Sequence, residues 1–172
     1  LNITCTLTQG KNIITIQATD KAGNTVTKTY VVNYTAATPM KIITLQIDKS
    51  TISINGISKT IDAEGSKPVI KNNRTLLPIR VLIESLGGTV NWNGETREVT
   101  INLDYRTIVL TIDNNTATVD GIKMQIDPDN SKVTPIIISG RTYLPLRFII
   151  EHINGTVSWD RATQTVTIYY MP

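Results

Sequence analysis

Residues 74–92 read RTLLPIRVLIESLGGTVNW, and residues 141–159 read RTYLPLRFIIEHINGTVSW. The two stretches align from Arg74 with Arg141 to Trp92 with Trp159, and the alignment continues without a gap as far as Ile101 and Ile168, with roughly half of the positions identical. Self-similarity at a fixed offset indicates two copies of one supersecondary unit, and the rest of the fold is built around them.

The self-similarity extends upstream of the quoted stretch. INGISKTID (54–62) corresponds to VDGIKMQID (119–127), but at a slightly shorter offset than the one that relates the quoted stretches, so the second copy contains two extra residues between Asp127 and Pro135. We therefore predict two repeated units, at about residues 42–104 and 105–170, packed as one domain over residues 42–172.

Each unit is expected to open with a β-hairpin, followed by a short strand. Asn55-Gly56 and Asp120-Gly121 are strong hairpin signals, because both central residues of a type I′ turn need positive φ. The short strand is RTLLP in the first unit and RTYLP in the second. The proline that ends it is expected in the first turn of a helix, where a missing N–H costs nothing.

The helix predicted after each proline carries one apolar stripe. Its apolar residues follow the i, i+3, i+4, i+7 spacing of a buried helix face: Ile79, Leu82, Ile83 and Leu86, and then Leu146, Ile149, Ile150 and Ile153. Gly87 and Asn154 are expected to end these helices in the left-handed conformation. On the polar face of each helix, the sequence predicts an i, i+4 ion pair between an arginine and a glutamate.

A second hairpin closes each unit and carries the two tryptophans of the chain. Trp92 shares a strand face with Val90, and Trp159 shares one with Val157. This alternation with core valines predicts that both indoles are buried. The alternative is an exposed indole, which would suit a sugar ring.

The expected fold is α+β and mainly antiparallel β, with two repeated units in one domain and a partial β-sandwich fragment at the N-terminus. The repeated residues mostly build elements: they fill a core, start and end the helices, or pack in the hairpins. A catalytic site rarely recurs twice in one domain at the same spacing. We therefore interpret the repeated motif as scaffold, with a duplicated binding surface as the alternative.

Residues 1–35 follow a different pattern. Apolar residues alternate along ITIQAT, DKAGN (20–24) is typical of a turn, and the alternation resumes up to Tyr34, which predicts a hairpin with one buried face. Residues 1–8 are expected to add a third strand that includes Cys5. Because Cys5 is the single cysteine, no intrachain disulfide can form.

The stretch LTQGKNIITIQATDKAGNTVTKTYVVNY resembles the final strands of a bacterial immunoglobulin-like domain, through GKN, the alternating ITIQATD and the AGN turn. The resemblance covers residues 1–35 and implies a fragment without its earlier strands. Its exposed strand edges are expected to pair with the following domain or with a second copy of the chain. Residues 36–41, which contain Pro39, are expected to form a linker.

Composition argues against two classes of partner. Over 172 residues the net charge is only +3, and the basic residues are scattered rather than gathered into the stripe typical of a nucleic-acid reader. No apolar run approaches the roughly 18 residues that a membrane helix needs. We therefore expect no nucleic-acid partner and no membrane span, and we expect any secretion signal to lie upstream of Leu1.

Four residues are candidates for a ligand surface. Arg74 and Arg141 recur at the start of the short strand, where each could bond loop carbonyls or hold an anionic ligand, and the structural role is favoured. Tyr105 and Tyr169 are expected to point outward, as aromatic residues of a glycan-binding surface would.

Metal and catalytic chemistry find little support in the sequence. His152 is the single histidine, and in the last helical turn it suits the helix dipole. Asp127 and Asp129 could bind calcium loosely or solvate a loop, and the loop is favoured. With no nucleophile–base arrangement, no CxxC and no phosphate-binding glycine loop, the sequence predicts no catalytic residue, no metal site and no cofactor.

PVIKNNRTLLPIRVLIESLGGTVNWN and PIIISGRTYLPLRFIIEHINGTVSWD resemble the copper amine oxidase N-terminal-like domain, through R-T-x-L-P-x-R, the helix ending in Gly and T-V-x-W-[ND]. The resemblance covers residues 42–170, and Asn73 departs from it where a glycine is usual. It implies a stalk of antiparallel sheet wrapped on helices. The oxidase chemistry itself needs three copper-binding histidines and a tyrosine in Asn-Tyr-Asp or Asn-Tyr-Glu, whereas this chain has one histidine, and Asn33-Tyr34-Thr35 lacks the acid.

The expected function is therefore that of a non-catalytic structural, stalk or adhesion module in a secreted or surface multidomain protein of a Gram-positive bacterium. The resemblance implies neighbouring domains of the same protein as partners, because such modules recur beside immunoglobulin-like or cell-wall-anchoring domains. The alternative is a module that binds cell-wall polymer or another glycan. The expected location is extracellular or at the cell wall.

Overall fold

The computed structural model describes residues 4–35 and 39–172. The chain divides into two units, residues 1–38 and 39–172, each compact in itself. Among the described residues, antiparallel β-sheet dominates and two short α-helices accompany it. The predicted class, α+β and mainly antiparallel β, is confirmed. None of the helices in the described ranges is long and apolar enough to cross a membrane.

The N-terminal unit contains an antiparallel hairpin, β1 (Gly10–Thr19) and β2 (Thr25–Tyr34). Asp20 organises the predicted turn, because its Oδ1 accepts hydrogen bonds at 2.9 Å from the backbone N–H groups of Ala22 and Asn24. No described residue of this unit is buried, so the predicted buried face is wrong. A two-stranded sheet has no second layer within its own unit to cover either face.

The predicted third strand is not found in residues 4–8, which have no regular structure, and residues 1–3 lie outside the described residues. Cys5 is exposed and lies in no strand, contrary to its predicted place. An alternation of apolar residues this short does not by itself give the segment a neighbouring strand to pair with. The described part of this unit is therefore a two-stranded sheet and not half of a sandwich.

The larger unit repeats its elements along the chain. In the first half they are β3 (Lys41–Gln46), β4 (Thr51–Ile54), β5 (Ile57–Thr60), β6 (Val69–Lys71), β7 (Arg74–Pro78), α1 (Arg80–Leu86), β8 (Thr89–Asn93) and β9 (Glu98–Leu103). In the second half, residues 105–170, they are β10 (Arg106–Thr111), β11 (Thr116–Val119), β12 (Ile122–Gln125), β13 (Ile136–Ile138), β14 (Arg141–Pro145), α2 (Leu146–His152), β15 (Thr156–Asp160) and β16 (Thr165–Tyr170). The short strands β6 and β13, and the first strands β3 and β10, are additions that the motif did not predict; β3 begins at the last residue of the predicted linker.

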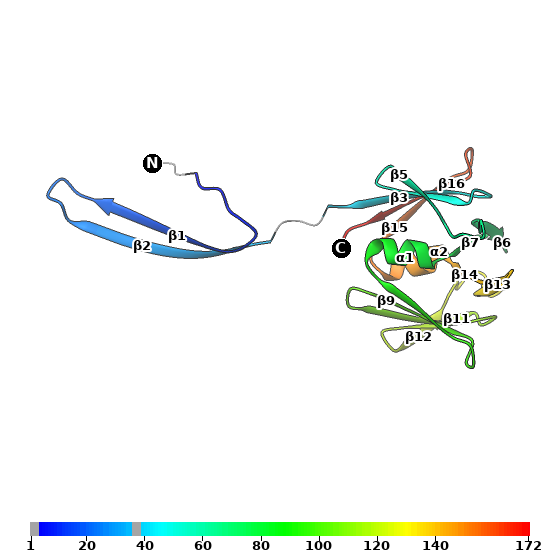
Figure 1. Ribbon diagram of the computed structural model, residues 1–172. Helices are drawn as coiled ribbons and strands as arrows, with labels where there is room; N and C mark the ends of the chain where they lie inside the picture. Colours follow the sequence, from blue (N-terminus) through cyan, green and yellow to red (C-terminus); the bar gives the residue numbers. More distant parts are fainter. Residues whose placement is uncertain (1–3, 36–38) are drawn as a thin grey trace. The chain divides into compact units, whose positions relative to one another are not determined.

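Three sheets organise these strands. Two five-stranded sheets have the orders β12-β11-β10-β9-β8 and β15-β16-β3-β4-β5, and a four-stranded sheet has the order β13-β14-β7-β6. Within this unit, Figure 1 shows α1 and α2 between the two five-stranded sheets. Each five-stranded sheet combines two strands from one half with three from the other, so the halves interlock rather than pack as separate bodies.

The four-stranded sheet joins the two halves through β7 and β14. In their antiparallel register Leu77 lies opposite Leu144, Pro78 lies opposite Tyr143, and Leu76 lies opposite Pro145. Leu77 and Leu144 occupy equivalent positions of the two halves, so the register is symmetric about this pair. Both leucine side chains are fully buried. The repeated RTxLP motif thus pairs with its own copy.

The predicted type I′ turns are confirmed. Asn55 and Asp120, and the glycines that follow them, all have positive φ. Each turn is also tied to the neighbouring strand: Asn55 Oδ1 accepts the N–H of Ile42 at 2.8 Å, and Asp120 Oδ1 accepts the N–H of Thr107 at 2.9 Å. Both side chains therefore fix the turn to the first strand of their own half.

The helices confirm the apolar stripe but not the place of the prolines. Every residue of both stripes is buried. Gly87 has φ 103° and Asn154 has φ 62°, as predicted for the helix ends. Pro78 and Pro145, however, end β7 and β14; Pro145 has an extended backbone, with φ −62° and ψ 107°. The pairing of β7 with β14 holds the prolines in the sheet, so each helix starts one or two residues later.

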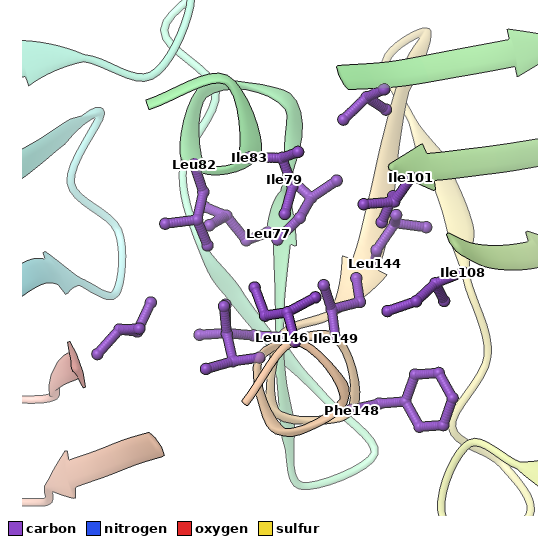
Figure 2. Close-up of a cluster of buried hydrophobic side chains, with 14 of the residues drawn as sticks. Leu77, Ile79, Leu82, Ile83, Ile101, Ile108, Leu144, Leu146, Phe148 and Ile149 are labelled. Atoms are coloured by element: carbon purple, nitrogen blue, oxygen red, sulfur yellow. The ribbon is translucent and has the colours of Figure 1, made fainter. Parts of the chain in front are cut away.

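Figure 2 shows how the helices, the motif strands and one five-stranded sheet share a core. Leu77 and Leu144 lie between the two helices, and Ile101 and Ile108 approach from the sheet. These side chains belong to one buried cluster that draws on both halves. Because fully burying one such side chain stabilises a fold by about 1.5–3 kcal/mol, this shared cluster holds the larger unit together.

A close backbone approach requires glycine after each helix. A Cβ at Gly88 would lie 2.5 Å from the carbonyl oxygen of Asn102. A Cβ at Gly155, the equivalent position, would lie 2.7 Å from Ile150 Cγ2 and 3.2 Å from the carbonyl oxygen of Tyr169. The absence of a side chain lets the chain leaving each helix pack directly against a neighbouring strand.

Candidate ligand-binding grooves

Two grooves lie on the larger unit, and equivalent residues line them. The first groove includes Asp62, Arg80, Glu84, Trp92, Arg141 and Thr142. The second groove includes Asp127, Arg147, Glu151, Trp159, Arg74 and Thr75. Their volumes, about 610 Å³ and about 1250 Å³, are those of sites for small organic ligands or larger. The duplicated residues therefore create a duplicated concave surface.

Both tryptophans are exposed, although the sequence predicted that they would be buried. Trp92 is 42% exposed and Trp159 is 37% exposed, so neither indole is buried. Trp92 does share its strand face with Val90, which is buried, but β8 and β15 are edge strands. Val90 belongs to the buried cluster that the apolar residues of α1 help to form, whereas Trp92 lies outside that cluster. Neither indole N–H donates to an acceptor among the described residues.

Each groove contains an arginine from one half that pairs with an acid of the other. Arg74 Nε lies 2.6 Å from Asp127 Oδ2. Arg141 Nε lies 3.5 Å from Asp62 Oδ2, and its Nη2 pairs with Glu64. Arg74 also donates to the carbonyl oxygen of Asn73, the kind of loop bond that the sequence predicted, but the acidic partners were not predicted. The three ion pairs that these two arginines form clamp the halves together beside the grooves.

Hydrogen bonds and charges near the first groove lower the pKa of two carboxyl groups, those of Glu64 and Asp62. The hydrogen bond from Arg141 lowers the pKa of Glu64. Burial by itself raises the pKa of Asp62, but the hydrogen bonds from Ser66 and the charge of Arg141 outweigh it and leave the pKa lowered. Both groups are therefore carboxylates at neutral pH. Asp62 Oδ2 is buried and has no hydrogen-bond donor among the described residues, so the charge of Arg141, with Nε at 3.5 Å, is what balances it.

The predicted ion pairs on the helices are confirmed and form the outer rim of each groove. Arg80 Nη1 lies 3.4 Å from Glu84 Oε1, and Arg147 Nη1 lies 3.4 Å from Glu151 Oε1. Arg80 additionally donates to the carbonyl oxygen of Val90 at 2.8 Å. All four charged side chains are about half exposed, so each pair stabilises the fold by less than about 1 kcal/mol.

The two tyrosines lie outside both grooves. Tyr169 is 38% exposed and points outward as predicted, while its neighbour Tyr170 is buried. Tyr105 is 76% exposed, and its hydroxyl accepts a hydrogen bond from Asn154 Nδ2 at 2.9 Å. The four predicted candidates, Tyr105, Tyr169, Arg74 and Arg141, are thus not brought to one surface. Instead the arginines lie in separate grooves.

The remaining polar candidates have partners within the fold. His152 Nδ1 lies 2.7 Å from the carbonyl oxygen of Phe148, one turn earlier in α2. Asp127 pairs with Arg74, and its Oδ1 accepts the backbone N–H of Asp129. Across residues 4–35 and 39–172, no group of three or more His, Cys, Asp or Glu side chains converges as a metal site would require.

Asp62 and Asp127 are the groove residues whose role the sequence analysis missed. A signal existed, because they are the last residues of the matched segments INGISKTID and VDGIKMQID. The two extra residues of the second copy, however, separate the alignment of the aspartates from the alignment of the arginines. The repeat therefore did not indicate that each aspartate pairs with an arginine. Only the interlocked halves bring each aspartate to the arginine of the other half.

Comparison with known proteins assigns the larger unit to a family. The family model described as "Copper amine oxidase N-terminal domain" matches residues 65–168, which is more than half of the chain. The chain therefore belongs to this family, and the predicted resemblance to the copper amine oxidase N-terminal domain is confirmed over these residues. The domain for which the family is named is a non-catalytic part of copper amine oxidases. No curated protein and no solved structure matches the chain.

Proposed function

We propose that the chain is a non-catalytic structural module, a stalk or adhesion segment, of a secreted or surface multidomain bacterial protein. The observation that carries this proposal is the use of the repeated motif. RTxLP pairs with its own copy across Leu77 and Leu144, and both helix stripes are buried in the shared core. A repeated motif whose residues mainly pack the core is what we expect of a domain that acts as a spacer. Membership in a family named for a non-catalytic domain supports the same function.

The proposed location is extracellular or at the cell wall of a Gram-positive bacterium, with neighbouring domains of the same protein as partners. The resemblance of residues 1–35 to a bacterial immunoglobulin-like domain supports this proposal. The experiment is fractionation of the source bacterium with an antibody against the chain, using a cytoplasmic enzyme as the control. We expect the chain in the wall or medium fraction, and its recovery with the cytoplasmic control would refute the surface location.

The non-catalytic part of the proposal has its own assay. The purified chain is incubated with Cu²⁺ and a primary amine, and hydrogen peroxide is measured against an authentic copper amine oxidase. We expect no amine-dependent peroxide, because the single histidine, His152, cannot form a three-histidine copper site. Peroxide production that scales with chain and amine concentration would contradict a purely structural role.

The N-terminal hairpin is proposed to pair with a neighbouring domain or with a second copy of the chain. Ile13 and Val31 are cross-strand partners and both are exposed, as an uncovered apolar sheet face would be. Sedimentation velocity of the full chain over a range of concentrations measures self-association, with Val31→Lys as the test variant. Association that weakens in the variant would support the second copy, and a monomer at all concentrations would leave a neighbouring domain as the partner.

A second candidate function is binding to cell-wall polymer or another glycan. The exposed indoles of Trp92 and Trp159 favour it, because each lies in a groove beside charged side chains. Co-sedimentation of the chain with purified Gram-positive cell walls, at low and high salt, tests this function. Binding that survives high salt would support a wall receptor. If binding is absent or is lost at high salt, only the structural role remains supported, because an attraction that salt screens away is a non-specific attraction between charges.

A further inference from the structure

We propose that the two grooves are equivalent binding sites for a neutral saccharide, with Trp92 and Trp159 as the surfaces on which a sugar ring stacks. This inference rests on the second candidate function, glycan binding, and assigns it to residues other than the exposed tyrosines. Three observations carry it: the half-exposed indoles, the balance of charge in each groove and the recurrence of the same side chains in both.

The indoles provide the apolar surface that a sugar ring needs. Each tryptophan lies on an edge strand and borders a groove whose lining includes buried apolar residues, such as Val99 in the first and Val166 in the second. A pyranose presents C–H groups on its face and hydroxyl groups on its edge. A half-exposed aromatic ring next to polar side chains fits both parts, because it has an apolar face and a free N–H.

The charges in each groove indicate a ligand without net charge. The first groove is lined by two arginines and two carboxylates: Arg80, Arg141, Asp62 and Glu84. The second is lined by three of each: Arg74, Arg147, Arg161, Asp127, Asp129 and Glu151. An excess of positive charge would favour phosphate or carboxylate ligands, and neither groove has one. Hydroxyl groups both donate and accept hydrogen bonds, so they can use the arginines and the carboxylates together.

The carboxylate of Asp62 lies at the first groove with one oxygen bonded and the other covered. Asp62 Oδ1 accepts the backbone N–H of Ser66 at 2.9 Å, whereas its Oδ2 has no hydrogen-bond donor among the described residues. Arg141 Nε, at 3.5 Å from Oδ2, provides charge but not a close hydrogen bond. Because this oxygen is covered in the structure, its nearest donor is the side chain of Arg141, and the polar groups that line the groove itself are the ones a ligand would meet.

The recurrence of the groove predicts two sites on each chain. In the alignment of the two halves, Trp92 corresponds to Trp159, and the pair Arg80–Glu84 corresponds to Arg147–Glu151. A polymeric glycan could engage both sites, which would raise the overall affinity above that of a single groove. Short oligosaccharides should instead show two sites of similar and weak affinity.

Intrinsic fluorescence can test this inference directly, because Trp92 and Trp159 are the two tryptophans of the chain. The full chain is titrated with tetrasaccharides of β-linked glucose and of β-linked N-acetylglucosamine, and with inorganic polyphosphate as the anionic comparison. We expect a saturable change of tryptophan emission with at least one neutral tetrasaccharide, and none with polyphosphate at moderate salt. Calorimetry should give two sites per chain.

The matched variants separate the grooves from other aromatic surfaces. Trp92→Ala and Trp159→Ala should each remove one site, and Trp92→Phe, which keeps a stacking ring, should retain the site with affinity reduced by about tenfold or less. Tyr105→Ala and Tyr169→Ala remove exposed aromatic rings outside the grooves, so they should leave both sites intact. Circular dichroism and the thermal midpoint of each variant establish that it is folded.

Three results would overturn the inference. Saccharide binding that the double variant Trp92→Ala/Trp159→Ala does not weaken would place the site elsewhere, while glycan binding itself would stand. Saturable binding of polyphosphate alone would refute the neutral ligand class. No emission change and no heat with either tetrasaccharide at millimolar concentration would refute the saccharide sites, whereas cell-wall co-sedimentation would still decide the broader function independently.

Discussion

The two five-stranded sheets pair equivalent strands in equivalent registers, yet the chain connects them differently. In one sheet β9 and β10 are joined by a tight turn at Asp104 and Tyr105. In the other, β16 pairs with β3, which lies near the opposite end of the larger unit in sequence, and Tyr170 lies opposite Lys41 as Leu103 lies opposite Arg106. The same strand pair thus forms with and without a connecting turn. Because the pairing does not depend on a connecting turn, we infer that the apolar faces of the strands select it.

The largest expected effect comes from emptying equivalent core positions on the two sheets. Ile43 and Ile108 are fully buried, on β3 and β10 respectively. Each Ile→Ala variant should lower the free energy of unfolding by about 2–5 kcal/mol, because it removes buried methyl groups and leaves a cavity. If the faces select the pairing, urea unfolding should give similar losses for the two variants.

The matched controls for this comparison are Ile57→Ala and Ile122→Ala. These isoleucines occupy equivalent positions in β5 and β12, and they are 75% and 67% exposed. Both variants should change the free energy of unfolding by less than about 0.5 kcal/mol. A much smaller loss of stability for Ile43→Ala than for Ile108→Ala would contradict our interpretation. It would mean that the sheet whose central strands, β9 and β10, are joined by a turn contributes more stability than the sheet without that turn.

The second expected effect concerns the glycines that follow the helices. Gly88→Ala should destabilise the protein by about 1–3 kcal/mol, because the new Cβ meets a backbone oxygen that cannot rotate away. Gly155→Ala should cost less, since its closest contact is a side-chain methyl group of Ile150. Gly94→Ala is the control, because its Cβ would meet its nearest neighbour, the indole Nε1 of Trp92, at an ordinary 3.6 Å. Thermal denaturation of the three variants measures the order, and equal effects at Gly88 and Gly94 would show the close approach to be unimportant.

A smaller effect is expected from the arginines that clamp the halves. Arg74→Met leaves the largely buried carboxylate of Asp127 without its ion-pair partner, at a cost of about 1 kcal/mol. Arg141→Met removes the ion-pair partner of Asp62 and Glu64, which are more exposed than Asp127. We therefore expect the free energy of unfolding to fall by a similar or smaller amount. Urea midpoints at low and high salt provide the measurement. Arg161→Met, at a groove arginine outside these ion pairs, is the comparison, and a larger loss there would refute the clamp.

The smallest expected effect distinguishes the two type I′ turns by their response to acid. The hydrogen bonds from the N–H of Thr107 and from the Arg106 side chain lower the pKa of Asp120, whereas Asn55 at the equivalent turn does not titrate. A lowered folded-state pKa stabilises the fold above the unfolded pKa of about 4 and loses that contribution as the pH falls through the folded value. Asp120→Asn should therefore be slightly less stable than the parent chain at pH 7.

That difference should shrink as the pH falls below about 4, because the parent chain then loses the same interaction. Urea unfolding at pH 7 and at pH 3 measures it, and Asn114→Asp, which places an acid in another turn of the same half, is the control for a general charge effect. A gap between Asp120→Asn and the parent chain that widens in acid would contradict the lowered pKa.

The sequence predicted local features better than contacts between segments. The asparagine–glycine and aspartate–glycine turns, the helix stripes and the helix ends at Gly87 and Asn154 depend on residues within a few positions of one another. The buried face of the N-terminal hairpin and the burial of Trp92 were predicted from alternation alone and were wrong. Alternation identifies the two faces of a strand, but it does not tell whether anything covers them.

The candidate site shows the same division. Because Arg74 and Arg141 recur in the sequence, they could be singled out, and the outward direction of Tyr169 followed from its buried neighbours. The acids that pair with the arginines could not be assigned, since each lies in the other half of the chain. The grooves exist because the two halves exchange strands and place these charges together beside an edge strand.

The repeated elements, their turns and the apolar faces of the core follow from the sequence, since they depend on backbone preferences and on side-chain periodicity. The tertiary structure alone decided which strands pair across the halves, which acid meets each arginine and that both indoles stay exposed. The reason is geometric: exposure depends on what packs over a strand and on whether that strand is at the edge of its sheet, and neither property belongs to a single residue.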